Sequence, residues 1–67
     1  MDFKLHKPFI ELDNLLKAAG IAAHGADAKQ IILAGAVFVN GAVEKTVRKT
    51  LRAGDRVDGG DNRISGI

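Results

Sequence analysis

Apolar residues recur at helical spacing in two short segments of the chain. In residues 11–19 these positions are Leu12, Leu15, Leu16 and Ala19, and in residues 25–34 they are Ala28, Ile31 and Ile32. A glycine that suits a helix C-terminus follows each segment, Gly20 after the first and Gly35 after the second. The pattern therefore predicts two short amphipathic helices, one from Glu11 to Ala19 and one from about Gly25 to Ala34.

The clearest strand pattern follows the second helix. Val37-Phe38-Val39 is β-branched and aromatic, Asn40-Gly41 is a strong two-residue hairpin signal, and Ala42-Val43 begins the return strand. We expect a type I′ turn with positive φ at both Asn40 and Gly41. The segment therefore predicts an antiparallel hairpin.

The remaining strand patterns are less regular. A short edge strand is expected at Phe3-Lys4-Leu5, where apolar and polar residues alternate. Turns at residues 53–55 and 59–62 flank short candidate strands at residues 56–57 and 63–65, whose pairing cannot be derived from the sequence. Together the elements predict an α+β fold: two short helices packed on a small, mostly antiparallel sheet.

Length and composition predict one folded domain, spanning residues 1–67 with a modest core. Hydrophobic residues make up 46% of the chain and charged residues 27%, a balance that favours a folded domain over a disordered tail. The chain has no cysteine, which excludes disulfides and fits a reducing compartment. Since neither a signal peptide nor an apolar run long enough for a membrane span occurs, we expect a cytoplasmic location and no membrane partner.

Positive charge is concentrated in the second half of the chain. The net charge is only +2, and residues 1–40 carry four bases and four acids. From Glu44 to Arg56 the two acids Glu44 and Asp55 face five bases, which leaves a local balance of +3. These bases are Lys45, Arg48, Lys49, Arg52 and Arg56. The segment should attract a polyanion, but on charge alone an ordinary solvated basic face is an equally good interpretation.

A second candidate for phosphate binding is the start of the second helix. Helix starts expose unpaired backbone N–H groups, and Gly25 permits close approach, so the corner at His24, Gly25 and Ala26 is suited to accept a phosphate oxygen. Lys29 lies one turn further along the same face. A tight interhelical turn explains Gly25 equally well, Lys29 has a solvated position as its alternative, and the simplest interpretation of His24 is that it neither caps the helix nor contacts phosphate.

The sequence contains no recognisable catalytic or metal-binding constellation. Ser65, the only serine, has no marked His/Asp partners, and neither a Walker loop nor a dinucleotide fingerprint occurs. His6 and His24 are eighteen positions apart without carboxylates at ligand spacing. We therefore expect no enzyme activity, no cofactor and no metal. The aromatic residues Phe3, Phe9 and Phe38 are expected in the core rather than exposed for stacking on bases.

The order of these features resembles the alpha-L RNA-binding motif, the small domain named after ribosomal small-subunit protein four. The match covers about two thirds of the chain, residues 12–57, and runs through Leu12-Asp13, Gly20–Ala23, Ala28, Ile31-Ile32, Gly35, Val37, Val39-Asn40-Gly41 and Gly54-Asp55. The chain resembles in particular the stand-alone YbcJ-like branch, through residues 25–29 and Glu44.

The chain also departs from the general pattern of that motif. Glu11 stands where the pattern has arginine, and His24-Gly25 stands where it has Ser-Arg, so no RNA contact is carried over to Glu11 or Gly25. The bases that follow the hairpin in the stand-alone branch are similar in number here but differently placed.

The resemblance implies an RNA-binding protein without a cofactor, whose partner is structured RNA and in particular ribosomal RNA. Phosphate contacts are expected from Lys29 and from the bases between Lys45 and Arg56, with weak base-specific recognition. Asn40, Gly41, Gly54 and Asp55 are expected to shape the sheet, because they are turn-forming residues. A monomer that joins a ribosome or another ribonucleoprotein fits this picture. The alternative is a protein-interaction module whose basic face meets an acidic partner.

Overall fold

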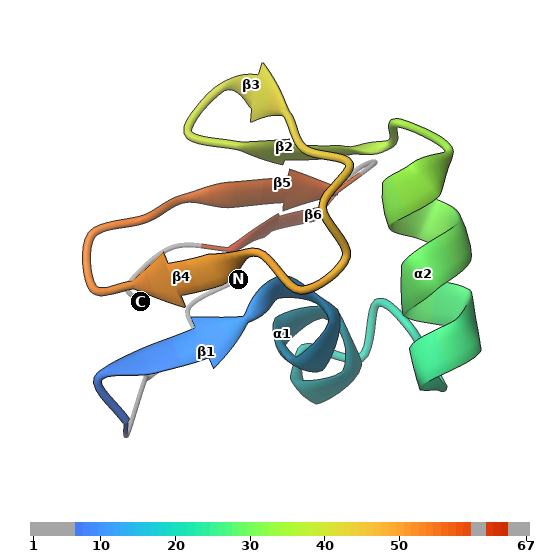
Figure 1. Cartoon of the computed structure of the whole chain (residues 1–67), viewed down its shortest axis with the longest axis horizontal. Coiled ribbons are helices and arrows are strands. Elements are labelled where there is room, and N and C mark those ends of the chain that lie inside the picture. The colour runs from blue at the N-terminus through green and yellow to red at the C-terminus, as the bar shows by residue number, and fades with distance from the viewer. Residues whose placement is uncertain (1–6, 60–61, 65–67) are drawn as a thin grey trace.

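Two helices and two small antiparallel sheets make up the computed structural model, which describes residues 7–59 and 62–64. This is the α+β fold that the sequence predicts (Figure 1). The helices are α1 (Leu12–Ala18) and α2 (Gly25–Leu33). The strands are β1 (Phe9–Glu11), β2 (Val37–Val39), β3 (Ala42–Val43), β4 (Thr50–Arg52), β5 (Val57–Gly59) and β6 (Asn62–Ile64).

The larger sheet contains four of these strands in the order β3-β2-β5-β6, and each neighbouring pair is antiparallel. Its β2–β3 edge is the predicted hairpin, with φ of 53° at Asn40 and 87° at Gly41, which confirms positive φ at both turn positions. The candidate strands near the C-terminus correspond to β5 and β6, although β5 continues to Gly59, where a turn was expected. Residues 3–5 and 65 lie outside the described residues.

The smaller sheet, β1 paired with β4, is not predicted by the sequence. Each strand has three residues, and Ile10 lies opposite Leu51 in the register. Segments this short carry too little alternation to be distinguished from loops. This pairing matters for the site because β4 lies within the basic stretch, residues 44–56, and β1 leads directly into α1 (Figure 1).

Both helices end as the glycines predict, one residue earlier than expected. Gly20 and Gly35 each have φ of 78°, directly after the C-cap residues of α1 and α2. Behind α1, the N–H of Ile21 donates to the Leu16 carbonyl at 3.0 Å, which is the backbone pattern of a Schellman motif. This motif satisfies carbonyl groups that the end of a helix would otherwise leave unpaired.

The core forms where one face of each helix meets the inward face of the sheets. Its buried members are Leu12, Leu15, Leu16, Ala22, Ala28, Ile32, Val37, Val39, Leu51, Val57 and Ile64. Ile31, expected in the buried stripe, is only partly buried against this cluster.

The expectation that the phenylalanines belong to the core is wrong for the two that the structure describes. Phe9 is 50% exposed and Phe38 is 42% exposed. Side chains alternate between the faces of a strand, so Val37 and Val39 take the inward positions of β2 and Phe38 points outward. Ile10 displaces Phe9 from the core side of β1 in the same way. Phe3 lies outside the described residues.

Candidate nucleic-acid interface

Hydrogen bonds within the segment shape the residues between β3 and β4. The Glu44 carboxylate accepts a hydrogen bond from the Thr46 N–H at 3.2 Å, and the Lys49 N–H donates to the Thr46 carbonyl at 3.2 Å. These two bonds close successive turns in a segment that has no regular secondary structure. The bases on this segment are therefore carried by a loop of defined shape.

The same loop is attached to the start of α1. The N–H groups of Leu12 and Asp13 donate to the carbonyls of Lys49 and Val47, at 2.8 and 3.1 Å. These are the first amides of the helix, which have no partner within it. The Val47 side chain packs against the core, while Lys45, Arg48 and Lys49 are exposed. The loop thus turns its apolar residue inward and its bases toward solvent.

All eight residues predicted to bind RNA are exposed to solvent. They are His24, Gly25, Lys29, Lys45, Arg48, Lys49, Arg52 and Arg56. Two of them make ion pairs: the guanidinium of Arg48 lies 3.5 Å from the carboxylate of Glu11, and that of Arg56 lies 3.8 Å from Asp58. The other four bases form no ion pair with a carboxylate of the described residues. Lys29, Lys45, Lys49 and Arg52 are therefore without a direct ion pair there, although the charges of Lys49 and Arg52 help to lower the pKa of Asp55.

The structure brings Lys45 close to α2, the helix that carries Lys29. The Cε atom of Lys45 lies 3.6 Å from the position that a Cβ would take at Gly35, directly after this helix. Lys29 precedes Gly35 by six residues, or about 9 Å along a helix axis. The His24–Gly25 corner lies at the opposite end of α2, about 15 Å from Gly35 by the same rise per residue. Along the helix axis, Lys29 therefore lies nearer to Lys45 than the His24–Gly25 corner does.

At the His24–Gly25 corner, the His24 side chain makes no capping hydrogen bond, although its carbonyl accepts from the Ala28 N–H at 3.1 Å. Gly25 is the first residue of α2, and a Cβ there would meet no heavy atom within 4 Å. Its φ angle is also not positive. The turn therefore does not require glycine at this position, which removes the tight-turn explanation for Gly25.

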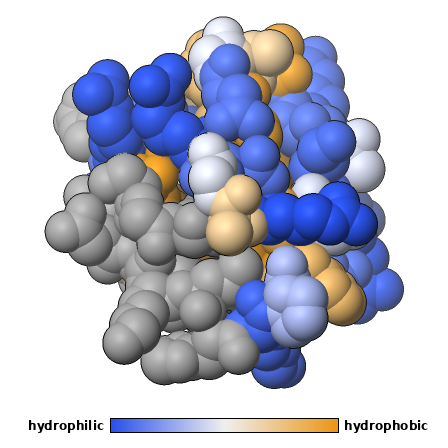
Figure 2. Space-filling view, turned by 90° about the vertical axis from the view of Figure 1, so that its left-hand side faces the viewer, coloured by the Kyte–Doolittle hydropathy of each residue, from blue (hydrophilic) through white to orange (hydrophobic). Residues whose placement is uncertain are grey.

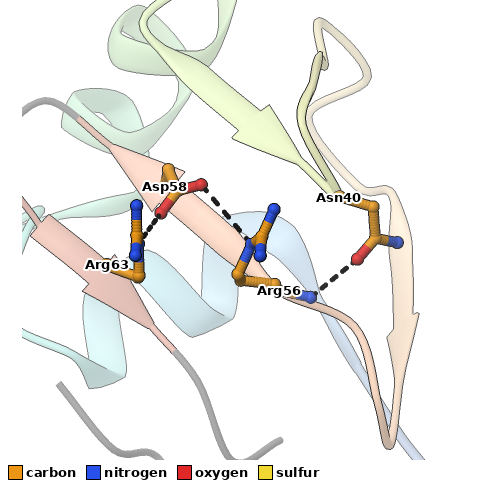
Figure 3. A network of polar contacts seen from close by, with 4 residues as sticks. All are labelled: Asn40, Arg56, Asp58 and Arg63. Atoms are coloured by element: carbon orange, nitrogen blue, oxygen red, sulfur yellow. Dashed lines mark hydrogen bonds and ion pairs between the residues drawn. The ribbon is translucent and has the colours of Figure 1, made fainter.

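Arg52 and Arg56 lie at the other end of the basic stretch, where a network joins the β2–β3 and β4–β5 turns. The Asn40 N–H donates to the Arg56 carbonyl at 2.8 Å, and the Arg56 N–H donates to the Asn40 side-chain oxygen at 2.9 Å (Figure 3). Asp55 accepts from the Arg52 N–H at 2.8 Å and from the Asn40 amide at 3.1 Å. These bonds, the backbone one foremost, hold the pKa of Asp55 below its usual value. Asn40 and Asp55 thus shape the sheet, as their turn chemistry predicts.

The charged side chains around Asp58 continue this network on the outward face of the larger sheet. Arg63 contacts the Asp58 carboxylate at 3.0 Å, beside the contact that Arg56 makes with it (Figure 3). Figure 2 views the molecule from the side where the two turns lie, and the part that is not grey is mostly hydrophilic. Charge on this end is therefore partly balanced within the protein.

Two residues beside the candidate site carry no positive charge, so the charge pattern of the sequence does not indicate them. Phe9 lies directly opposite Arg52 in the β1–β4 register, and Glu11 is the ion-pair partner of Arg48. Only the alternation of Phe9 with Ile10 hints at an outward aromatic ring. The Arg48–Glu11 pair depends on the docking of the loop against α1, which the sequence does not show.

Other kinds of site find little support in the described part of the chain. No group of three or more His, Cys, Asp and Glu side chains there is arranged to hold a metal ion. Neither described helix has the length and apolar character to cross a membrane. An open groove beside α2 contains one acid and one base; it is lined by Lys17, Gly20, Ile21, Ala22, Ala23, Asp27, Gln30 and Ile31.

An α+β domain with exposed bases on an anchored loop has the features of a small polyanion-binding module. A family model described as S4 domain matches residues 3–65, and the chain therefore belongs to the S4 domain family. S4 domains generally bind RNA and are not typically catalytic. No curated protein matches the chain.

Proposed function

We propose that this protein binds structured RNA through phosphate contacts from the loop between β3 and β4, from Lys29 on α2 and from Arg52 on β4. The observation that carries the proposal is the build of the loop: Val47 and two carbonyl groups hold it to α1 and the core, and its bases face solvent. Bases on a backbone that is already ordered lose less entropy on binding than bases on a flexible tail.

The arrangement of charge favours recognition of shape over recognition of sequence. Lys29, Lys45 and Lys49 are exposed and form no ion pair with a carboxylate of the described residues. Ammonium groups on flexible stems suit phosphate oxygens, and they do not read base edges with fixed geometry. Structured RNA presents phosphates in a defined spatial pattern, which bases carried on an ordered loop are able to match.

The finer identity of the protein is part of the same proposal. The Gly25–Lys29 stretch and Glu44 support a place in the stand-alone YbcJ-like branch of the S4 domain family. We propose ribosomal RNA, free or within a ribonucleoprotein, as the target of a monomeric cytoplasmic protein. His24 and Gly25 enter this proposal as a secondary phosphate contact at the start of α2.

A salt titration tests the proposal. The association constant of the full chain for a purified ribosomal RNA fragment should fall steeply with salt, with a log–log slope of about 0.7 to 0.9 per phosphate contact. An acidic protein of similar size serves as the comparison partner. Salt-sensitive binding to the RNA, with no binding to the acidic protein, supports the proposal. Binding to the acidic protein with no RNA affinity would instead assign the basic surface to a protein partner.

A further inference from the structure

The outward face of the β1–β4 sheet places an aromatic ring next to a cation that forms no direct ion pair with a carboxylate of the described residues. Phe9 and Arg52 are direct partners in the antiparallel register, and both are exposed. Residues directly opposite in such a pair project to the same face, with Cβ atoms about 5 Å apart. Ile10 and Leu51, the next pair, face the core. The ring of Phe9 and the guanidinium of Arg52 therefore share one solvent-facing surface.

This face continues directly from the loop between β3 and β4. Strand β4 begins at Thr50, immediately after Lys49, and runs toward the β4–β5 turn (Figure 1). Arg52 is three positions beyond Lys49, which is about 10 Å of extended chain. At the loop end of the face, Glu11 is already paired with Arg48 at 3.5 Å. A nucleic-acid strand that follows the loop would therefore pass Glu11 where its charge is already balanced by Arg48, and reach Phe9 beyond it.

Phe38 provides an internal comparison. It is a half-exposed phenylalanine on the outward face of the other sheet, where its direct partners are Val43 and Asp58. The carboxylate of Asp58 lies among Arg56 and Arg63, with which it is paired. Phe38 thus has an apolar neighbour on one side and a carboxylate on the other. Phe9, by contrast, lies opposite a guanidinium without an ion-pair partner among the described residues, which is the environment that complements a nucleotide.

We propose that Phe9 and Arg52 form a nucleotide-binding shelf, on which an unpaired RNA base stacks against the Phe9 ring while Arg52 contacts the adjoining phosphate. The inference rests on the proposed RNA-binding function and extends it from phosphate contacts to stacking. Every base has an aromatic face, so such a shelf binds unpaired nucleotides with little regard to sequence. The protein then distinguishes structured RNA with an unpaired nucleotide beside a helix from a fully paired duplex.

Two RNA probes and two matched phenylalanine variants test the shelf. One probe is a stem–loop with a single-stranded 3′ extension, and the other is a blunt duplex of equal phosphate number. Phe9→Leu removes the aromatic face but keeps an apolar side chain, and Phe38→Leu makes the same change on the other sheet. Phe9→Leu should bind the extended stem–loop about tenfold more weakly than wild type does, because aromatic stacking contributes strongly to binding of single strands. Its affinity for the duplex should stay within about twofold of wild type, and Phe38→Leu should change neither affinity.

A fluorescent reporter gives a second measurement that does not depend on affinity. The chain has no tryptophan or tyrosine, so Phe9→Trp and Phe38→Trp each introduce a single reporter ring. Oligouridylate should quench the emission of Phe9→Trp by stacking and leave that of Phe38→Trp unchanged. Thermal melts of all four variants establish that each is folded.

The outcomes separate this proposal from the one on which it rests. The shelf is overturned if Phe9→Leu binds both the duplex and the stem–loop as wild type does and Phe9→Trp shows no quenching. The proposal of phosphate binding would then still stand. If the wild-type protein binds neither RNA probe, both the shelf and the proposed RNA-binding function are overturned. A self-association that Phe9→Leu abolishes would assign the exposed ring to a second copy of the chain and also overturn the shelf.

Discussion

The side-chain amide of Asn40 donates a hydrogen bond to the carboxylate of Asp55 at 3.1 Å, across fifteen positions of sequence. Asn40 belongs to the β2–β3 hairpin turn and Asp55 to the turn that connects β4 in one sheet with β5 in the other, so this bond ties the two turns together. The Asn40 side-chain oxygen also accepts from the Arg56 N–H. One asparagine therefore uses both halves of its amide to set the position at which β5 enters the sheet.

Replacing Asn40 with glycine isolates the contribution of this amide. Glycine keeps the positive φ that Asn40 adopts but removes both side-chain hydrogen bonds. Asn40→Gly should lower the free energy of unfolding by about 1 to 2 kcal/mol. Asn14→Ala is a suitable control, because the exposed Asn14 side chain makes only a 3.4 Å contact with Glu11. Chemical denaturation that shows equal stability for Asn40→Gly and wild type would contradict the role of the amide.

The low pKa of Asp55 makes part of the stability pH-dependent. Its carboxylate is stabilised first by the Arg52 N–H and then by the Asn40 amide, so its pKa in the folded protein lies below the usual value of 3.8. A depressed folded-state pKa contributes stability that is fully present above the unfolded pKa and is lost as the pH falls through the folded pKa. Asp55→Asn should therefore be less stable than wild type at neutral pH, and the difference should shrink as the pH falls below 3.8. A difference that is constant between pH 7 and the acid limit would rule this coupling out.

The hairpin turn gives a prediction about glycine. Gly41 has φ of 87°, which a β-branched residue does not adopt without strain. Gly41→Val should destabilise the protein by more than about 1 kcal/mol, or a loss of about 4 to 8 °C in melting temperature for a domain of this size. Gly25→Ala is the control, because the Cβ enters open space at a helix start. Equal melting temperatures for Gly41→Val and Gly25→Ala would refute the turn assignment.

The ion pair between Arg48 and Glu11 predicts a gain in RNA affinity. Both side chains are solvent-accessible, so the pair adds little stability and competes with phosphate for the guanidinium. Glu11→Gln frees Arg48 and removes a negative charge from the face, and it should raise RNA affinity about two- to fivefold at low salt. The gain should diminish as salt is added, because counterions screen the charge that was removed. An unchanged or lower affinity at low salt would show that Arg48 does not contribute to the site.

The sequence predicts those parts of the fold that depend on local chemistry. Helical spacing and the terminal glycines place α1 and α2, and Asn40-Gly41 places the hairpin, because each signal is complete within a few residues. The β1–β4 pair joins segments about forty positions apart, and neither strand has enough residues to show a pattern of its own. For the same reason the outward position of Phe9 and the partner of Arg48 could not be derived. The identity and exposure of the bases were predictable, but their division into paired and free cations was not.

Charge reversal on the loop tests the central claim most directly. Lys45→Glu/Lys49→Glu alters two exposed lysines that form no ion pair with a carboxylate of the described residues. Lys7→Glu/Lys17→Glu makes the same change of net charge at exposed lysines outside the proposed site. At fixed low salt, the loop variant should bind the ribosomal RNA fragment at least about tenfold more weakly than the control variant, with both retaining a cooperative melt. Equal affinities in the two folded variants would show that net charge alone attracts RNA and that the loop is not its binding site.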